Sequence, residues 1–237
     1  MSQLRNHAFV SRGQRDKAFR ITFTREEFVQ VVLELTVAAY QAMNQANIAQ
    51  PDWPEDTFTI NLATYLRTIG FDQELSIRVH TQVEQYTEAI RTGQGAPKSA
   101  KKIDLVLYEV WERDYDRVHF AWEAKLVGDK RVNPNYSGLN SAYANEAIYR
   151  FIRGDYAASL PDAGVLGYVM AGDVVNIVHD INSSMGRLRR NQPLSASNHL
   201  RLAAPIAEFE QVYRSEHQRV TGLPIKLYHL FLQFAFD

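Results

Sequence analysis

The chain has 237 residues, of which 46% are hydrophobic and 22% are charged, so its length predicts one domain, or one with a small appendage, and its composition excludes global disorder. Lysine and arginine number 26 and aspartate and glutamate 27, a net charge of −1 that excludes a uniformly basic nucleic-acid-coating protein. The sequence has no cysteine, which excludes disulfides, thiolate metal sites and cysteine nucleophiles.

The N-terminal part of the sequence predicts two helices and a strand. Apolar residues recur at helical spacing from Thr24 to Asn44, and Glu27 stands three residues after Thr24, as in a capping box. A second helix is expected from Pro54 to Ile69, with Gly70 as its stop. From Leu75 to Val83 apolar and polar residues alternate, which is typical of a strand with one buried face.

The rest of the sequence alternates strands with helices. Residues 92–102 are rich in Gly, Pro, Ser and Lys and predict a mobile, basic loop. The elements expected after it are two strands joined by a charged turn at 112–116, a helix, a strand, a helix and two strands: Ile103–Val110, Val118–Val127, Ser141–Ile152, Val165–Met170, Val174–Met185, Phe209–Tyr213 and Ile225–Phe236. This order predicts an α/β fold class, with a central mixed sheet flanked by helices.

We expect residues 1–50 to form an N-terminal helical extension packed on the core, and residues 51–237 to form one compact domain. Residues 1–20 are polar and lack the apolar stretch of a signal peptide. No run of eighteen apolar residues occurs, so no transmembrane helix is expected. The sequence therefore predicts a cytoplasmic protein without a membrane anchor.

The predicted hairpin of residues 103–127 carries three ionisable residues on one face. A turn centred on Arg113 and Asp114 places Asp104 directly opposite Glu123, with Cβ atoms roughly 4.5–5.5 Å apart. Lys125 stands two residues beyond Glu123 and so points to the same face. An ordinary solvated ion pair is the alternative explanation, but apolar neighbours on that face argue against it: Val106, Tyr108 and Ala121.

Two carboxylates at this separation repel each other unless a positive charge lies between them. A divalent cation, Mg²⁺ or Mn²⁺, suits ligands that are all oxygen: Asp104, Glu123 and the backbone carbonyl of Ala124. Lys125 could orient or help to deprotonate a bound water, or hold a phosphate, and the sequence leaves these roles open. The hairpin therefore predicts a metal-dependent site for phosphate chemistry.

Asp104, eighteen intervening residues and then Glu123-Ala124-Lys125, all within apolar strands, resemble the motif of the PD-(D/E)xK, or restriction-endonuclease-like, nuclease superfamily. Ile103 stands where that pattern has Pro, and the element order from Glu55 to Met170 is similar to that of the family core. The resemblance implies a restriction-endonuclease-like core and catalytic roles for Asp104, Glu123 and Lys125.

The resemblance also implies a further acidic residue from the first core helix, as a catalytic group and metal ligand. Glu55 is the first choice, with Asp56 and Glu74 as alternatives. Glu55 could equally stabilise the helix N-terminus through the helix dipole.

Several basic residues near these elements are candidates for contacts with phosphate groups. They are Lys102, Lys130, Arg131, Arg150 and Arg153. The alternative for Arg150 is an ion pair with Glu146 four residues earlier on the same helix, and lysines in loops are commonly just solvated.

The resulting prediction is a Mg²⁺-dependent endonuclease that hydrolyses phosphodiester bonds of nucleic acid, DNA in preference to RNA, in restriction or phage defence. A homodimer or a protein partner is expected to supply specificity, because the chain is small and near-neutral and has no helicase or methylase region. The alternative is a catalytically silent nuclease-fold module that binds nucleic acid or a protein partner within a larger complex. The sequence contains no P-loop and no Gly-x-Ser-x-Gly motif, which disfavours nucleotide and serine hydrolysis.

Overall fold

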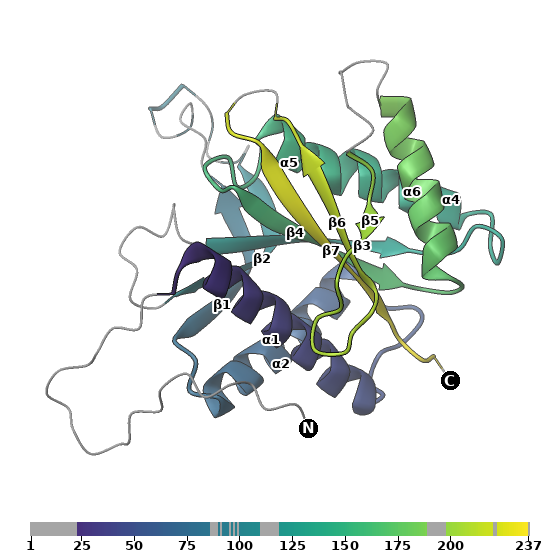
Figure 1. Ribbon diagram of the computed structural model, residues 1–237, viewed down its shortest axis with the longest axis horizontal. Coiled ribbons are helices and arrows are strands. Elements are labelled where there is room, and N and C mark those ends of the chain that lie inside the picture. Colours follow the sequence, from purple (N-terminus) through teal and green to yellow (C-terminus); the bar gives the residue numbers. More distant parts are fainter. Residues whose placement is uncertain are drawn as a thin grey trace, which may run out of the picture.

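A computed structural model describes residues 23–85, 90, 92–94, 96, 98, 100–109, 119–188, 198–219 and 222–236. Within them a seven-stranded mixed sheet lies between two layers of helices (Figure 1). The helices are α1 (Arg25–Gln45), α2 (Glu55–Asp72), α4 (Tyr136–Ala142), the π-helical segment η2 (Tyr143–Ile148), α5 (Tyr149–Arg153) and α6 (Val174–Leu188). The strands are β1 (Ile77–Gln85), β2 (Lys101–Glu109), β3 (His119–Val127), β4 (Asp162–Val169), β5 (Arg201–Leu202), β6 (Val212–His217) and β7 (Ile225–Gln233).

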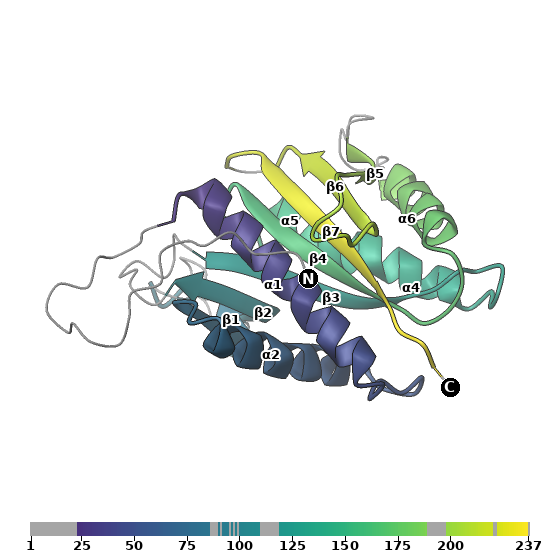
Figure 2. The same ribbon diagram turned by 60° about the horizontal axis from the view of Figure 1, so that its bottom comes forward.

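The strand order in the sheet is β1-β2-β3-β4-β7-β6-β5. Strands β1, β2 and β3 form an antiparallel meander, β4 and β7 run parallel to β3, and β6 and β5 continue antiparallel. Figure 2 shows α1 and α2 on one face of this sheet and α4, α5 and α6 on the other. The predicted α/β fold class, with a mixed sheet flanked by helices, is confirmed. None of the described helices combines the length and the apolar character that crossing a bilayer requires.

The β2–β3 pairing has the register that the sequence predicted. Leu105 lies opposite Trp122 and Tyr108 opposite His119, as a turn centred on residues 113 and 114 requires. That turn itself lies outside the described residues. Asp104 and Glu123 lie just beyond the last pair of this ladder, on neighbouring strands.

Helix α1 begins as predicted, with Thr24 and Glu27 forming a complete capping box. Its buried side chains share one apolar cluster with those of α2 and with the face of the sheet that includes Leu105 and Trp122. Residues 23–50 thus pack on the core, while the proposed division into an extension and a domain at residue 50 stays a prediction.

The prediction that α2 stops at Gly70 is wrong. The helix continues to Asp72 and ends where Glu74 adopts a left-handed φ of 55°, with the Leu75 N–H bonded to the Gly70 carbonyl at 2.9 Å. Gly70 is buried, and a Cβ there would lie 3.9 Å from a methyl group of Leu35. The helix therefore ends by backbone geometry at Glu74 and not at the glycine.

Two other predicted boundaries also moved. The helix expected from Ser141 begins at Tyr136 and includes the η2 segment, and it ends before a left-handed Gly154. The strand expected from Phe209 begins at Val212, and β5 was not predicted.

Five buried polar side chains form a continuous hydrogen-bonded chain in the core: Asn198, His217, Ser215, His229 and Tyr143. The Asn198 amide can only donate to His217 Nδ1, so the proton of that imidazole lies on Nε2 and is donated to Ser215. At the other end the Tyr143 hydroxyl donates to a main-chain carbonyl of β4, so it accepts from His229 Nδ1. Every bond is satisfied only when both histidines are neutral.

This hydrogen-bonded chain predicts that the folded protein loses stability as the pH falls. Burial lowers the pKa of His217 to about 4, whereas an unfolded histidine binds its proton near pH 6.5. The unfolded state therefore binds more protons between these pH values, and the free energy of unfolding falls as pH falls, by at most about 1.4 kcal/mol per pH unit for this group. His217→Gln should flatten that slope in urea titrations from pH 6.5 to 4, and His179→Gln on the exposed face of α6 should not. An unchanged slope in His217→Gln would contradict the assignment.

Candidate active site

Four predicted residues from three elements meet at one end of the β2–β3 pair. Asp104 comes from β2, Glu123 and Lys125 from β3, and Glu55 is the first residue of α2. A cleft of about 380 Å³ opens beside them between the start of α2 and the helices that follow β3, and it is lined by Pro54, Glu55, Asp56, Lys125, Leu126, Leu139, Ala142 and Glu146.

Asp104 is held by main-chain and side-chain donors. One carboxylate oxygen accepts from the Ala124 N–H at 2.8 Å, and the other accepts from the Gln82 amide at 3.2 Å. The paired residues of β2 and β3 end at Leu105 and Trp122, so the Asp104 side chain takes the N–H that the next ladder bond would have used. The N–H and C=O of one strand residue point to the same side, so the Ala124 carbonyl also faces Asp104.

Gln82 is a residue that the sequence analysis missed. It lies in the middle of β1 with a left-handed φ of 53°, and its amide also donates to Asp56 at 3.3 Å. The predicted alternation breaks at this point. Val79 is buried in the cluster under α1 and α2, whereas Val83 packs against the cluster on the opposite face. A glutamine in the left-handed region has no sequence signature, because Gly and Asn are the residues that favour it.

Glu123 is the most buried acidic group of the site, with 1% of its surface exposed. One oxygen accepts from Arg150 at 2.8 Å and lies 3.8 Å from the Lys125 ammonium. The other oxygen has no hydrogen-bond partner among the described residues. Burial, reinforced by the negative charge of Asp104, raises the pKa of Glu123 to about 8, although both cations oppose the shift.

Lys125 and Glu55 form an ion pair at the mouth of the cleft. The ammonium donates to one Glu55 oxygen at 2.7 Å, and the Leu126 N–H donates to the other at 3.3 Å. Burial disfavours the charged ammonium, but the nearby acidic groups, Glu55 foremost, together outweigh it and raise the pKa of Lys125. Burial also raises the pKa of Glu55. Glu55 is therefore positioned as the partner of Lys125, and its role as a metal ligand stays a prediction.

The two alternatives to Glu55 have different positions. Asp56 is bonded to Gln82 beside Asp104, so it belongs to the site. Glu74 follows the opposite end of the 18-residue α2, about 27 Å away along the helix axis, so it cannot share a ligand shell with Glu55. The prediction that Glu74 could serve as the metal ligand in place of Glu55 is therefore wrong.

Arg150 lies at the site and not at a separate phosphate-binding surface. Its guanidinium binds Glu123 and also donates to the Tyr156 hydroxyl at 3.1 Å. The intrahelical pair with Glu146 that the spacing allowed is not the ion pair that forms. Only the tertiary fold brings α5 over β3, so sequence spacing alone could not have revealed the Arg150–Glu123 contact.

Three of the other basic candidates form ion pairs with carboxylates of this chain. Lys130 pairs with Asp180, Arg131 with Asp129 at 3.2 Å, and Arg153 with Asp155. Lys102 is exposed at the start of β2. The structure does not gather these four cations into one cluster, and their contact with nucleic acid stays a prediction.

The described residues include no group of three or more His, Cys, Asp or Glu placed to hold a metal ion. The oxygen donors that the sequence predicted, Asp104, Glu123 and the Ala124 carbonyl, thus include only two acidic side chains. Comparison of the chain with protein-family models, with curated protein sequences and with solved structures found no match.

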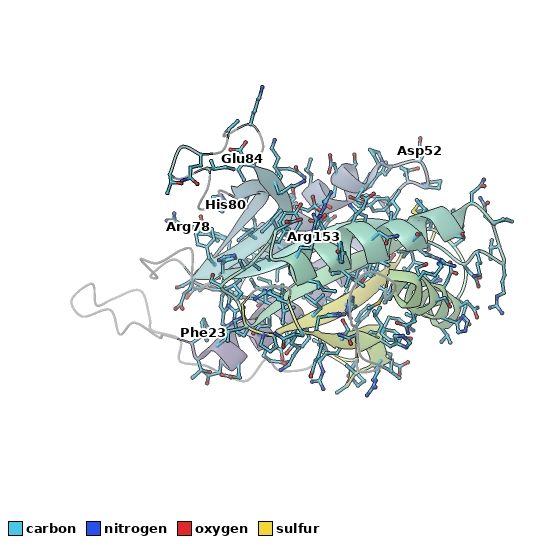
Figure 3. All side chains as sticks on the ribbon, turned by 90° about the horizontal axis from the view of Figure 1, so that it is seen from above. Phe23, Asp52, Arg78, His80, Glu84 and Arg153 are labelled. Carbon is cyan, nitrogen blue, oxygen red and sulfur yellow. The ribbon has the colours of Figure 1, made fainter. Side chains whose placement is uncertain are left out.

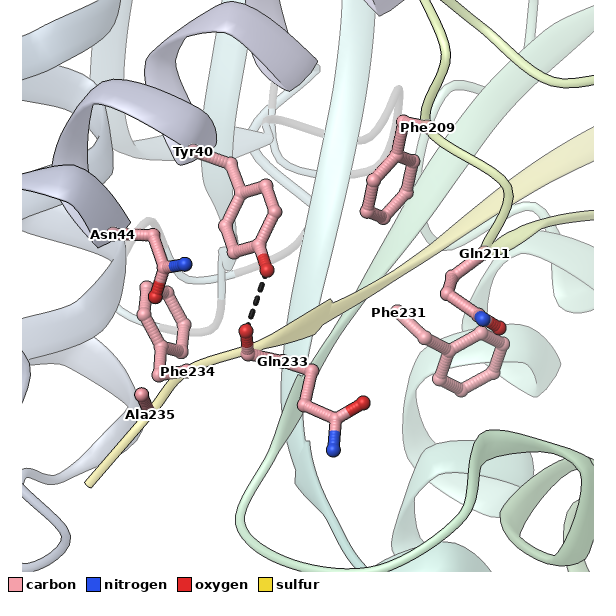
Figure 4. Close-up of a pocket in the computed structure, with 8 residues that line it drawn as sticks. All are labelled: Tyr40, Asn44, Phe209, Gln211, Phe231, Gln233, Phe234 and Ala235. Carbon is pink, nitrogen blue, oxygen red and sulfur yellow. Dashed lines mark hydrogen bonds between the residues drawn. The ribbon is translucent and has the colours of Figure 1, made fainter. Parts of the chain in front are cut away.

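A second cavity, of about 370 Å³, lies between α1 and the C-terminal end of β7 (Figure 4). Its lining is aromatic and carboxamide, and the Tyr40 hydroxyl donates to the Gln233 carbonyl there. It contains no carboxylate, ammonium, guanidinium or imidazole, so it lacks the groups that phosphate chemistry needs: its residues are Tyr40, Asn44, Phe209, Gln211, Phe231, Gln233, Phe234 and Ala235.

The left-handed backbone at Gln82 predicts an unusual response to glycine. A left-handed L-residue costs about 1 kcal/mol that glycine does not incur, so Gln82→Gly should unfold with a free energy about 1 kcal/mol higher than Gln82→Ala. At Arg78, on the same strand with no positive φ, the order should reverse, with Arg78→Gly less stable than Arg78→Ala. Denaturant unfolding of the four variants checks this, and the same order at both positions would contradict it.

The buried carboxyl predicts a pH dependence of opposite sign from that of the histidines. In metal-free protein the folded state holds a proton on Glu123 up to about pH 8, while the unfolded carboxyl loses it near 4.5. The folded state therefore binds more protons in this window, and the free energy of unfolding falls as pH rises, by at most about 1.4 kcal/mol per pH unit. Glu123→Gln should remove the fall between pH 6.5 and 8 measured in EDTA, and Glu26→Gln, exposed on α1, should retain it.

Proposed function

We propose that this protein is a metal-dependent nuclease that hydrolyses phosphodiester bonds of nucleic acid, DNA in preference to RNA. The observation that carries the proposal is the meeting of Asp104, Glu123 and Lys125 beside an open cleft, where a buried oxygen of Glu123 has no hydrogen-bond partner in the described part of the chain. A carboxyl oxygen in that state is costly unless a proton or a cation satisfies it.

The donor chemistry fits Mg²⁺ or Mn²⁺. Asp104, Glu123 and the Ala124 carbonyl would hold the ion, since they are hard oxygen ligands on one side of the hairpin. Burial and then the negative charge of Asp104 raise the pKa of Glu123, and a cation bound between the two carboxylates would offset both effects. When bound, the ion would lower the pKa of a water and offset negative charge on the phosphate.

The residues of the chain supply the remaining functions. Lys125 is held protonated by Glu55, so it is suited to bind a non-bridging phosphate oxygen and not to remove a proton from water. In the hydrolysis, a water oxygen forms a bond to phosphorus, one ester P–O bond breaks, and the departing oxygen takes up a proton. Arg150 donates to the Glu123 carboxyl group and also to the Tyr156 hydroxyl, so it holds the Glu123 side chain in place.

The order α2, β1, β2, β3, the α4–α5 helices and β4 supports the resemblance to the PD-(D/E)xK nucleases, as does the position of Asp104 and Glu123 on neighbouring strands. Membership of that superfamily is part of this proposal. On the resemblance we propose a role in restriction or phage defence. The cytoplasmic location and a second copy or protein partner that supplies specificity, both expected from the sequence, are further parts of the proposal.

A catalytically silent binding module is the second candidate. It is favoured by the fact that the groups of the site already bind one another within the chain, Arg150 to Glu123 and Lys125 to Glu55. In such a module these pairs would be structural, and no metal would be required.

A cleavage assay distinguishes the two candidates. The purified chain with Mg²⁺ or Mn²⁺ should cut plasmid or single-stranded DNA, and Asp104→Asn or Lys125→Ala should each lower the rate by about 100-fold or more, because each removes a group that stabilises the transition state. Asp52→Asn, exposed in the turn before α2, is the matched control and should cut normally.

Cleavage at the normal rate by both site variants would show that the site is assigned wrongly. Absence of cleavage on every substrate, with binding intact, would favour the silent module.

A further inference from the structure

Strand β1 is an edge of the sheet, and four side chains on and beside it form a surface that the nuclease chemistry does not use. This surface, the β1 ledge, consists of Arg67, Arg78, His80 and Tyr108. Figure 3 shows Arg78 and His80 following one another along this strand, with Glu84 beyond them. Arg67, Arg78 and His80 are exposed, and Tyr108 is half-buried.

The centre of the ledge is a stacked pair of rings. The His80 and Tyr108 rings lie 5.0 Å apart with an angle of 28° between their planes, and the Tyr108 hydroxyl and His80 Nε2 are 2.6 Å apart. Tyr108 supports the imidazole from one side, while the imidazole itself is exposed to solvent. An exposed ring that is stacked on a neighbouring ring in this way can serve as a platform on which a further planar ring stacks.

Two guanidiniums flank this platform. Arg78 lies directly opposite Tyr108 in the β1–β2 register, and Arg67 reaches β1 by donating to the Val79 carbonyl at 3.1 Å. Partial burial and then the positive charges of both arginines lower the pKa of His80, so the platform ring is neutral at pH 7. A neutral ring flanked by two cations is complementary to a nucleic-acid base flanked by two phosphates, because the rings can stack while the arginines bind the phosphates.

The ledge leads to the candidate active site along the same strands. His80 stands two residues before Gln82, which donates to Asp104, and Tyr108 stands four residues after Asp104 on β2. At about 3.3 Å per strand residue, the platform lies roughly 7–13 Å from the row that contains the carboxylates.

We propose that the β1 ledge binds single-stranded nucleic acid, one base stacking on His80 with its neighbouring phosphates at Arg67 and Arg78. This inference rests on the proposed nuclease function, whose substrate it narrows. A duplex keeps its base faces covered by its own neighbouring bases, whereas a single strand presents them for stacking. Stacking does not distinguish one base from another, so the ledge binds without sequence preference.

Binding of labelled oligo-dT and of a matched duplex, measured by fluorescence anisotropy in EDTA with the full chain, tests this. The single strand should bind more tightly than the duplex. His80→Ala should weaken its binding about tenfold, and His80→Phe, which keeps a flat ring, should bind as the wild type does. Arg78→Ala should weaken binding and reduce the dependence of log affinity on log salt by about 0.7.

Matched controls are His179→Ala, exposed on α6, and Arg201→Ala on β5, the opposite edge of the sheet. Both should bind oligo-dT normally, and thermal unfolding checks that every variant is folded. Normal binding by both His80→Ala and Arg78→Ala, a preference for the duplex, or no binding of oligo-dT by the wild type would each overturn the proposal.

Cleavage with Mg²⁺ is measured separately, so failures of the two proposals are distinguishable. Cleavage by the wild type together with normal oligo-dT binding by the ledge variants overturns the ledge alone. Loss of binding in the ledge variants, when the wild type cuts nothing, leaves the ledge supported and overturns the nuclease.

Discussion

The constraint on which this site depends is the burial of two carboxylates, Asp104 and Glu123, side by side on one hairpin. Like charges this close are unstable out of water, so the surrounding structure supplies positive charge and donors. Arg150 reaches Glu123 from the helical layer, Lys125 approaches it along the same strand, and main-chain and amide N–H groups hold Asp104. Glu55 in turn neutralises Lys125. The position of α2 and that of α5 are thus tied to the same pair of acids.

The sequence predicted the part of the site that depends on one hairpin. Register and strand periodicity are local properties, so Asp104, Glu123 and Lys125 could be brought together from their spacing alone. Contacts between distant elements could not be predicted in this way. The pairing of Arg150 with Glu123 requires the crossing of a helix over a parallel strand, and the role of Gln82 requires a backbone conformation that no residue type signals.

The same distinction applies to the fold. Element types and their order follow from hydrophobic periodicity, which a packed core enforces along its whole length. Boundaries depend on a few backbone torsions. Helix α2, for example, continues past Gly70 to Asp72 and is ended by the left-handed Glu74. The buried chain from Asn198 to Tyr143 joins residues 55 positions apart, and no local sequence pattern connects them.

The left-handed Gln82 also affects the exposed edge of the sheet that β1 forms. An edge strand with a regular row of free N–H and C=O groups is a template on which another strand can add, and such pairing leads to aggregation. In β1 the regular pleat is interrupted at Gln82, and charged side chains of Arg78 and Glu84 stand on either side of it. The kink that orients a carboxylate in the site thereby also disfavours strand addition at an open sheet edge.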